Sequence, residues 1–137
     1  MDELAEQMQN RFAGFFPALL GMTLVSATKD RVVAELAVRD DLCTVPGILH
    51  GGAIMAFADT LGGIATMLNI APNARTTTIE SKTNFFAPGI AGTTVTAECL
   101  PVNRGRRTMT WQTSIRNAER RLLAQVTQTQ FVDTAAT

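Results

Sequence analysis

One carboxylate stands alone in a long, mostly apolar stretch of this sequence. Between Gly51 and Leu68, Asp59 is the only charged residue. Ionised carboxylates are seldom buried without a partner, because burial disfavours the charged form, and such groups cluster at catalytic sites. The stretch offers no basic partner, so Asp59 is a candidate nucleophile or general base. The structural alternative is a carboxylate bonded to a backbone donor or to an arginine of a second chain.

Two glycines, Gly51 and Gly52, begin the same stretch directly after His50. Free amides at the start of a helix carry the positive end of its dipole, and glycine lets the backbone approach a ligand closely. A carbonyl held at the Gly51 N–H would be stabilised as it becomes an oxyanion, and one such donor typically lowers the barrier by ~3–4 kcal/mol. The glycines would also serve a tight turn into the helix, and that turn would aim the amide.

Metal and redox chemistry find little support among the remaining reactive side chains. His50 is the only histidine, and no spacing of Cys or Asp residues completes a zinc site around it. Cys43 and Cys99 lack CxxC spacing and are expected to be free thiols in a reducing compartment. We therefore expect no metal and no cofactor, and His50 remains either a general base or a residue that shapes the turn.

Hydrophobic periodicity predicts the elements that position these residues. The predicted elements are a helix over residues 2–16, strands over 22–28 and 31–38, an irregular segment over 40–49, a helix over about 51–68, and strands over 76–86, 93–100, 108–115 and 122–132. The second helix is apolar on nearly every face and is expected to be buried all round. The short connections that follow it indicate an antiparallel meander. A curved antiparallel sheet wrapped around one central helix satisfies all these elements, in the α+β class.

Composition limits the classes of function. The 137 residues correspond to one domain, and 46% hydrophobic against 18% charged residues excludes a disordered chain. Twelve basic and twelve acidic residues balance, so no overall field attracts nucleic acid or an anionic membrane. The first residues do not form a signal peptide and no stretch is long enough to span a membrane, so we expect a cytoplasmic protein. Sheet edges and the apolar helix need cover, which predicts a homo-oligomer, a tetramer built as a dimer of dimers.

Several motifs carry a family resemblance. The segment 46–52 reads PGILHGG and is followed by an acidic residue nine positions after the histidine. A predicted strand over 78–88 reads TIESKTNFFAP, and a predicted turn over 104–108 reads RGRRT. Over roughly residues 12 to 132 the chain resembles the hotdog-fold thioesterases, closest to their phenylacetic-acid-pathway and 4-hydroxybenzoyl-CoA branch. The resemblance implies the hotdog fold and hydrolysis of an acyl-CoA.

The resemblance also implies roles for individual residues. The thioester carbonyl would bind the Gly51 amide of one chain, and Asp59 of the facing chain would act as nucleophile or general base. His50 would shape the turn and orient the Gly51 peptide. Thr78 matches a Ser or Thr that holds the attacking water in some relatives. On a regular strand Thr78 would share a face with Glu80, Lys82 and Asn84, and the sequence leaves open which face looks inward.

Three further positions, Thr44, Gly52 and Gly63, are assigned to substrate binding. Gly52 would line the substrate site beside Gly51. Thr44 stands where relatives carry Asn or Gln, and its shorter hydroxyl leaves open whether it still contacts water or the carbonyl. Gly62 and Gly63 lie on the helix near Asp59, where glycine costs ~1 kcal/mol relative to Ala. Either a second helix packs closely there across a dimer axis, or Gly63, which replaces a hydroxyl residue of the hydroxybenzoyl branch, leaves space for an acyl group.

Three arginines are the candidate contacts for coenzyme A, which is here part of the substrate. Arg104, Arg106 and Arg107 cluster on one predicted turn, and arginine is well suited to binding phosphate. The resembled family uses this neighbourhood to hold the CoA nucleotide, whereas the simpler alternative is a solvated hairpin tip.

The sequence therefore predicts an enzyme that hydrolyses an aryl- or fatty-acyl-CoA to the free acid and CoA. Two alternatives are a hotdog hydratase or dehydratase and a non-catalytic acyl-CoA-binding protein. The hydratases pair a catalytic histidine with a carboxylate, but His50 is followed by Gly-Gly instead of an aromatic residue and proline. A sensor would need an effector domain, for which the chain has no room. A purely structural oligomer is the third alternative.

Overall fold

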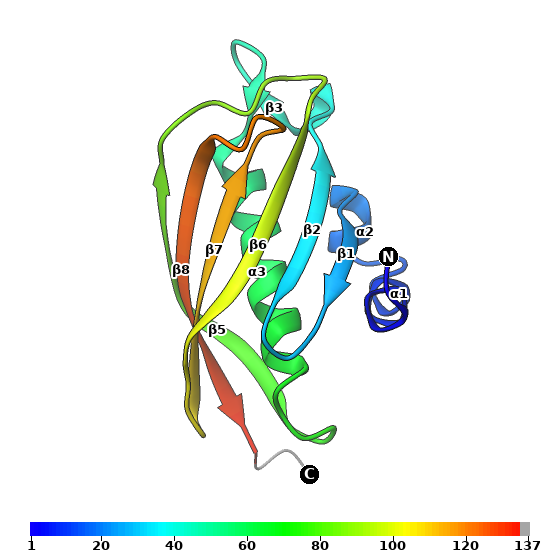
Figure 1. Ribbon diagram of the computed structural model, residues 1–137, viewed down its shortest axis with the longest axis vertical. Coiled ribbons are helices and arrows are strands. Elements are labelled where there is room, and N and C mark those ends of the chain that lie inside the picture. The colour runs from blue at the N-terminus through cyan, green and yellow to red at the C-terminus, as the bar shows by residue number, and fades with distance from the viewer. Residues whose placement is uncertain (135–137) are drawn as a thin grey trace.

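One curved antiparallel sheet wraps around one long helix, α3 (Gly51–Met67), in the computed structural model, which describes residues 1–134 (Figure 1). Its strands follow the order β1-β2-β6-β7-β8-β5. They are β1 (Thr23–Ala27), β2 (Val32–Ala37), β5 (Arg75–Phe85), β6 (Thr94–Arg104), β7 (Thr108–Arg116) and β8 (Leu122–Asp133). This arrangement confirms the predicted α+β hotdog fold.

Alternation along the central strands builds the core. Side chains at every second position of a strand point to the same face, and on β7 those at Met109, Trp111 and Ile115 are buried. Trp111 also ties the sheet to the helix, because its Nε1 donates to Thr66 Oγ1 at 2.9 Å. The helix is thereby fixed in rotation, with Phe57 among its fully buried side chains.

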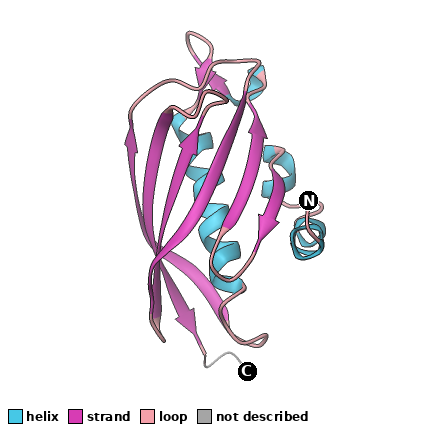
Figure 2. Cartoon of the chain, in the orientation of Figure 1, coloured by secondary structure: helices cyan, strands magenta, loops and turns pink. Residues whose placement is uncertain are grey.

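The N-terminal segment departs from the prediction of one helix over residues 2–16. The chain instead forms α1 (Glu3–Arg11) and α2 (Phe16–Leu20), both on the side of edge strand β1 (Figure 2). Pro17 suits the first turn of α2, and Gly21 ends it with φ of 88°, a left-handed conformation that favours glycine. Gln9 of α1 donates to Met22 O at 3.1 Å and accepts from Leu24 N at 2.8 Å, which satisfies polar groups at the β1 edge.

The segment predicted as irregular over 40–49 holds a 3-10 turn, η1 (Asp40–Leu42), and a small hairpin of β3 (Cys43–Thr44) and β4 (Ile48–Leu49). Gly47 turns between them with φ of 119°. Two-residue strands are too short for alternation to reveal them. Strand β6 also runs past its predicted end to Arg104, through an irregularity in pairing between Pro101 and Asn103.

Helix α3 was expected to be buried on all sides with the help of a second chain, and within the single chain one face of it is open. Gly52, Met55 and Asp59 are exposed along one face, whereas Leu61 and Ile64 are fully buried on the other. The sheet has only one concave side, so it covers only the side of the helix that faces it. Among the described residues β5 also has a neighbouring strand on one side only.

Candidate active site

The start of α3 presents a free backbone amide. His50 is the residue that precedes the helix, and its Nδ1 accepts the Gly52 N–H at 2.7 Å. The His50 N–H itself donates to Leu42 O at 2.9 Å. In the described part of the chain the Gly51 N–H donates to no group. Because His50 Nδ1 is engaged in this cap, the geometry favours the orienting role of His50 over a base acting through that nitrogen.

An apolar hollow of about 520 Å³ lies beside this amide. It is lined by Thr44, Ile48, Leu49, Gly51, Ile54 and residues 85–89. A Cβ built on Gly51 would lie 3.2 Å from Phe85 Cζ, so the absence of a side chain there lets the aromatic ring approach the helix start. The hollow therefore offers an apolar compartment next to a free amide donor.

Asp59 lies on the exposed face of α3, two turns further along. Within the single chain Asp59 is exposed. Two donors hold one of its oxygens: Thr78 Oγ1 lies 2.5 Å from Asp59 Oδ1, and Gln128 Nε2 lies 3.1 Å from the same atom. A second hollow of about 240 Å³ includes Asp59, Thr78 and Gly63.

A bulge in β5 decides the direction of Thr78. Thr78 pairs with Gln130, and the next pair is Glu80 with Thr129, so Ile79 is the extra residue. The bulge reverses the alternation: Thr76 and Thr78 face inward before it, and half-buried Ser81 follows it. The prediction that Thr78 shares a face with Glu80, Lys82 and Asn84 is therefore wrong, because one inserted residue flips every later side chain.

Sequence analysis missed two residues of this site, Gln128 and Gln130. Both are buried on β8, with relative exposures of 1% and 2%. Gln128 Nε2 donates to Gln130 Oε1 at 3.1 Å, and Gln130 Nε2 donates to Thr76 Oγ1 at 3.0 Å. Thr78 Oγ1 also lies within hydrogen-bond distance of Gln130 Oε1, and its single proton serves either this oxygen or Asp59 Oδ1 at a time. The signal was available, because both glutamines share their strand parity with apolar Val126 and Val132 and must point inward with them.

The two mid-helix glycines have different surroundings. Gly62 is buried, and a Cβ at this position would lie 2.3 Å from the side-chain carbon of Gln128. Gly63 is half-buried, and a Cβ there would meet nothing within 4 Å. Neither close packing of a second helix nor space for an acyl group accounts for this contact. Within the chain, the missing side chain of Gly62 makes room for Gln128. Gly63 opens onto the second hollow beside Asp59.

The structure does not bring the two chemical groups of α3 together within one chain. Gly51 and Asp59 are eight residues apart, which at 1.5 Å per residue is about 12 Å along the helix axis. Thr44 and Gly51 line the first hollow, whereas Asp59, Gly63 and Thr78 line the second. A thioester carbonyl bonded to the Gly51 amide is therefore too far from the same chain's Asp59 for direct attack.

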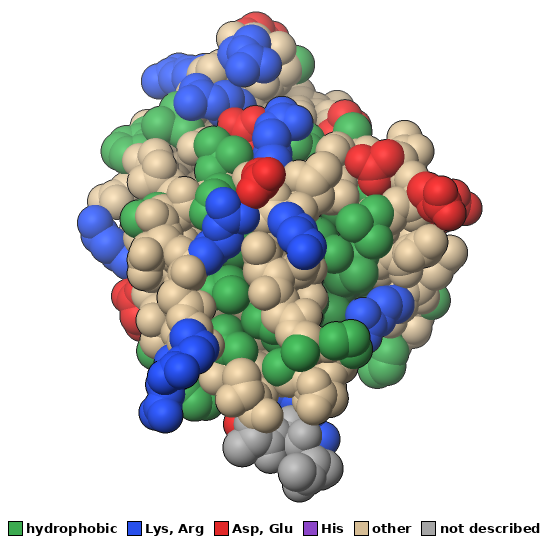
Figure 3. Space-filling model, turned by 60° about the horizontal axis from the view of Figure 1, so that its bottom comes forward, with side chains coloured by type: hydrophobic (Ala, Val, Ile, Leu, Met, Phe, Trp, Pro, Cys, Tyr) green, Lys and Arg blue, Asp and Glu red, His purple; other side chains and the backbone are tan. Residues whose placement is uncertain are grey.

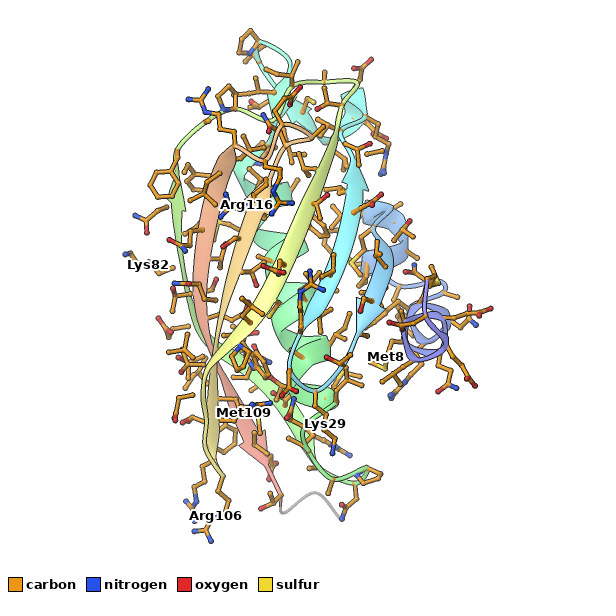
Figure 4. The ribbon with its side chains drawn as sticks, viewed as in Figure 1. Met8, Lys29, Lys82, Arg106, Met109 and Arg116 are labelled. Carbon is orange, nitrogen blue, oxygen red and sulfur yellow. The ribbon has the colours of Figure 1, made fainter. Side chains whose placement is uncertain are left out.

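The predicted arginine cluster is split. Arg104 belongs to strand β6 and turns back toward the β1–β2 hairpin, where its Nη1 lies 2.7 Å from Asp30 Oδ1 and 3.0 Å from Lys29 O. Arg106 points away from the molecule at the tip of the β6–β7 hairpin (Figure 4). Viewed from that end, basic side chains are spread over the surface with acidic and apolar ones between them (Figure 3). The exposed Arg106 and Arg107 are thus the two arginines of this cluster without a carboxylate partner among the described residues.

Other reactive groups contribute little. Burial raises the pKa of the Cys99 thiol to about 11, so it stays protonated near neutral pH and is a poor nucleophile. Within residues 1–134, no three side chains of His, Cys, Asp or Glu lie close enough together to hold a metal ion. No helix in this range is long and apolar enough to cross a membrane.

A curved sheet around one helix, a His-Gly-Gly helix start with a free amide, and a carboxylate two turns later define the class of hotdog-fold thioesterases. A family model confirms the class: the thioesterase superfamily model matches residues 46–124. The chain belongs to the thioesterase superfamily, and it is a thioester hydrolase. The predicted resemblance is thereby confirmed.

Individual relatives agree with this assignment. The chain is 30% identical over 105 residues to a 1,4-dihydroxy-2-naphthoyl-CoA hydrolase of Listeria monocytogenes, a match that covers 76% of this chain and 84% of the relative. A crystal structure of a thioesterase from Haemophilus influenzae superposes with a TM-score of 0.89 at 26% identity, covering 96% of this chain and 92% of the other. The PaaI protein of the Escherichia coli phenylacetic acid degradation operon shares the fold, with a TM-score of 0.82 at 20% identity over 97% and 95% of the two chains.

Proposed function

We propose that this protein hydrolyses an aryl- or fatty-acyl-CoA to the free acid and CoA, at a site built from two copies of the chain. The observation that carries the proposal is the free Gly51 amide beside an apolar hollow, about 12 Å along the helix from the only carboxylate on α3. The acyl group would enter that hollow and the carbonyl oxygen would accept the Gly51 N–H. The aryl option draws support from the Listeria relative, whose name describes an aromatic acyl-CoA substrate.

A second copy would supply the carboxylate. Met55 lies four residues from Gly51 and four from Asp59, and it is 39% exposed on the open face of α3. A two-fold axis beside Met55, with the two helices antiparallel, would set Gly51 of one chain opposite Asp59 of the other. The same packing would cover the open face of α3, and pairing along β5 would cover the free edge of the sheet. Two such dimers would form the homotetramer.

The chemistry has two routes. In the first, an Asp59 oxygen attacks the thioester carbon, the Gly51 N–H stabilises the oxyanion, and the CoA thiolate leaves to give a mixed anhydride that water then cleaves. In the second, Asp59 takes a proton from water, the resulting hydroxide attacks the same carbon, and the thiolate leaves and is protonated. Thr78, bonded to Asp59 Oδ1, would orient the carboxylate in the first route and the water in the second.

The decisive test is to incubate the protein with a panel of aryl-, fatty- and 2-enoyl-CoAs and a thiol reagent. Release of free CoA together with the free acid is the expected result. Loss of the acyl-CoA by double-bond hydration without thiol release would instead identify a hydratase. Tight binding with neither product would identify a non-catalytic binding protein.

Met55→Arg is expected to shift the assembly toward monomers, because it places two like charges beside the proposed axis. Light scattering and sedimentation at micromolar concentration measure this shift, and turnover should fall with the monomer fraction. Leu4→Arg is the matched control, because Leu4 is an exposed apolar residue of α1 and lies outside the proposed interface on α3. This variant should keep the wild-type mass. A stable, fully active Met55→Arg monomer would contradict the proposal of an active site built from two chains.

Replacing Arg106 and Arg107 together by Ala is expected to raise KM for acyl-CoA roughly tenfold and to leave kcat nearly unchanged. Contacts to the nucleotide phosphates would hold the ground state and the transition state alike, which is uniform binding. Arg104→Ala should have a smaller effect, because Arg104 is already paired with Asp30. Steady-state kinetics on full-length acyl-CoA and on acyl-N-acetylcysteamine, which lacks the nucleotide, provide the measurement. Equal losses on both substrates would show that the hairpin matters for folding and that CoA binds elsewhere.

A further inference from the structure

We infer that Gln128 is a positioning residue for Asp59, that Gly62 is glycine in order to admit it, and that Asp59 Oδ2 is the oxygen that reacts. The inference deepens the proposed function and rests on it, since it assumes that Asp59 does the chemistry. Three independent observations on α3 and β8 carry it: the donors around the carboxylate, the space at Gly62, and the uncompensated side-chain oxygen of Gln128.

The donors around Asp59 all converge on one of its oxygens. Thr78 Oγ1 and Gln128 Nε2 both lie within hydrogen-bond distance of Oδ1, at 2.5 and 3.1 Å. No donor to Oδ2 occurs among the described residues. Two bonds to Oδ1 fix the plane of the carboxylate, so Oδ2 keeps its lone pairs for the thioester carbon or for a water proton.

The amide of Gln128 can adopt only one orientation here. Its Nε2 faces three oxygens: Asp59 Oδ1, Gln130 Oε1 at 3.1 Å and, more distantly, the Asp59 backbone O at 3.4 Å. A flipped amide would set Gln128 Oε1 against the carboxylate and backbone oxygens of Asp59, two groups that can only accept. Gln130 is held in turn by its own donation to Thr76 Oγ1. The network thus aims the Gln128 donor at the carboxylate.

The cost of this arrangement indicates that the donor is kept for function. Gln128 is 1% exposed, and its Oε1 is buried without a hydrogen-bond partner among the described residues. A buried acceptor without a partner destabilises a fold, and an apolar side chain of similar shape would avoid that loss. Gly62 adds a second local cost, since glycine in mid-helix is unfavourable, yet a Cβ there would collide with Gln128 at 2.3 Å.

Gln128→Met is the primary test, because Met keeps the length and removes the donor. We expect kcat to fall about 10- to 100-fold, the range for losing a hydrogen bond to a charged group, with KM within about twofold of wild type. Thermal unfolding should show no loss of stability. A lower kcat with unchanged stability is not expected if Gln128 has only a structural role. Gln125→Met, the same substitution on the half-buried outward side of β8, is the control and should keep wild-type kcat. A Gln128→Met enzyme with wild-type kcat, or an equal kcat loss in Gln125→Met, would overturn the inference.

A double-mutant cycle tests the role of Gly62. Gly62→Ala should lower kcat by displacing Gln128, but Gly62→Ala combined with Gln128→Ala should be no slower than Gln128→Ala alone. Additive losses in the cycle would mean that Gly62 acts independently of Gln128 and would contradict the assignment. The proposed function has its own test: wild-type turnover in Asp59→Asn would show that Asp59 is not the active-site carboxylate. If Asp59→Asn is inactive and Gln128→Met is fully active, only the positioning role of Gln128 is contradicted, and the catalytic role of Asp59 stands.

Discussion

Asp59→Asn is expected to lower kcat for acyl-CoA hydrolysis by about 10²- to 10⁴-fold, the range typical of a lost general base, and to leave KM and assembly nearly unchanged. Asn has the size of Asp and keeps a side-chain oxygen as an acceptor for Thr78 and Gln128, which both bond to Asp59 Oδ1. It lacks the negative charge needed to attack a thioester or to deprotonate water. The loss should therefore fall on the chemical step.

Single-turnover kinetics with a thiol reagent, together with light scattering, measure these effects. Asp59→Glu should retain part of the activity, since the resembled family includes members with Glu at this place. A wild-type kcat in Asp59→Asn would assign Asp59 to structure. Hydrolysis in ¹⁸O-labelled water under single turnover tests the first route. Only a mixed anhydride that water attacks at the Asp59 carbonyl carbon puts ¹⁸O into Asp59 and sends an unlabelled Asp59 oxygen into the acid, whereas a general base acquires no label.

Gly51→Pro is expected to lower kcat about 10²- to 10³-fold, the typical effect of removing one oxyanion donor. Proline is tolerated at the first position of a helix, and His50 before it, with φ of −60° and ψ of 137°, already has the extended conformation that proline requires. The substitution therefore removes the N–H with little disturbance of the helix. It also adds side-chain atoms beside Phe85, which would lie 3.2 Å from a Cβ.

Gly51→Ala is the matched comparison, because it adds the Cβ and keeps the N–H. The ratio of kcat between the Ala and Pro variants isolates the amide donor from the contact with Phe85. Pre-steady-state kinetics on one acyl-CoA, with circular dichroism to verify the fold, give this ratio. Equal kcat values in the two variants would show that the Gly51 amide does not bind the oxyanion.

Mixing the two inactive variants tests whether one site needs two chains. A mixed dimer of Asp59→Asn and Gly51→Pro chains would hold one intact pair, Gly51 from the first and Asp59 from the second. After subunit exchange at equal concentrations, about a quarter of wild-type activity should return, because half of the dimers are mixed and each has one working site of two. Failure to regain activity, with mixed dimers verified by mass spectrometry, would contradict a shared site.

Local chemistry made much of this protein readable from its sequence. The run His50-Gly51-Gly52 before an apolar stretch predicts a helix start, because capping involves neighbours only two or three residues apart. Strand alternation and short turns likewise depend on near neighbours, so the sheet strands and the α+β class followed from periodicity, whereas the hotdog fold was implied by the family resemblance. The family itself followed from motifs of this kind, and the superfamily match over residues 46–124 confirms it.

Tertiary structure alone decided how the candidate site is assembled. Thr78 faces Asp59 only because a bulge at Ile79 reverses the alternation of β5, and a single inserted residue leaves no clear mark in a polar strand. Gln128 donates to Asp59 although the two residues are 69 positions apart in the sequence, because of the way the sheet packs on α3. The same register explains Gly62, whose missing side chain makes room for that glutamine. Periodicity shows which face a residue takes, whereas the contacts across the core depend on how sheet and helix are packed, and no local pattern encodes that.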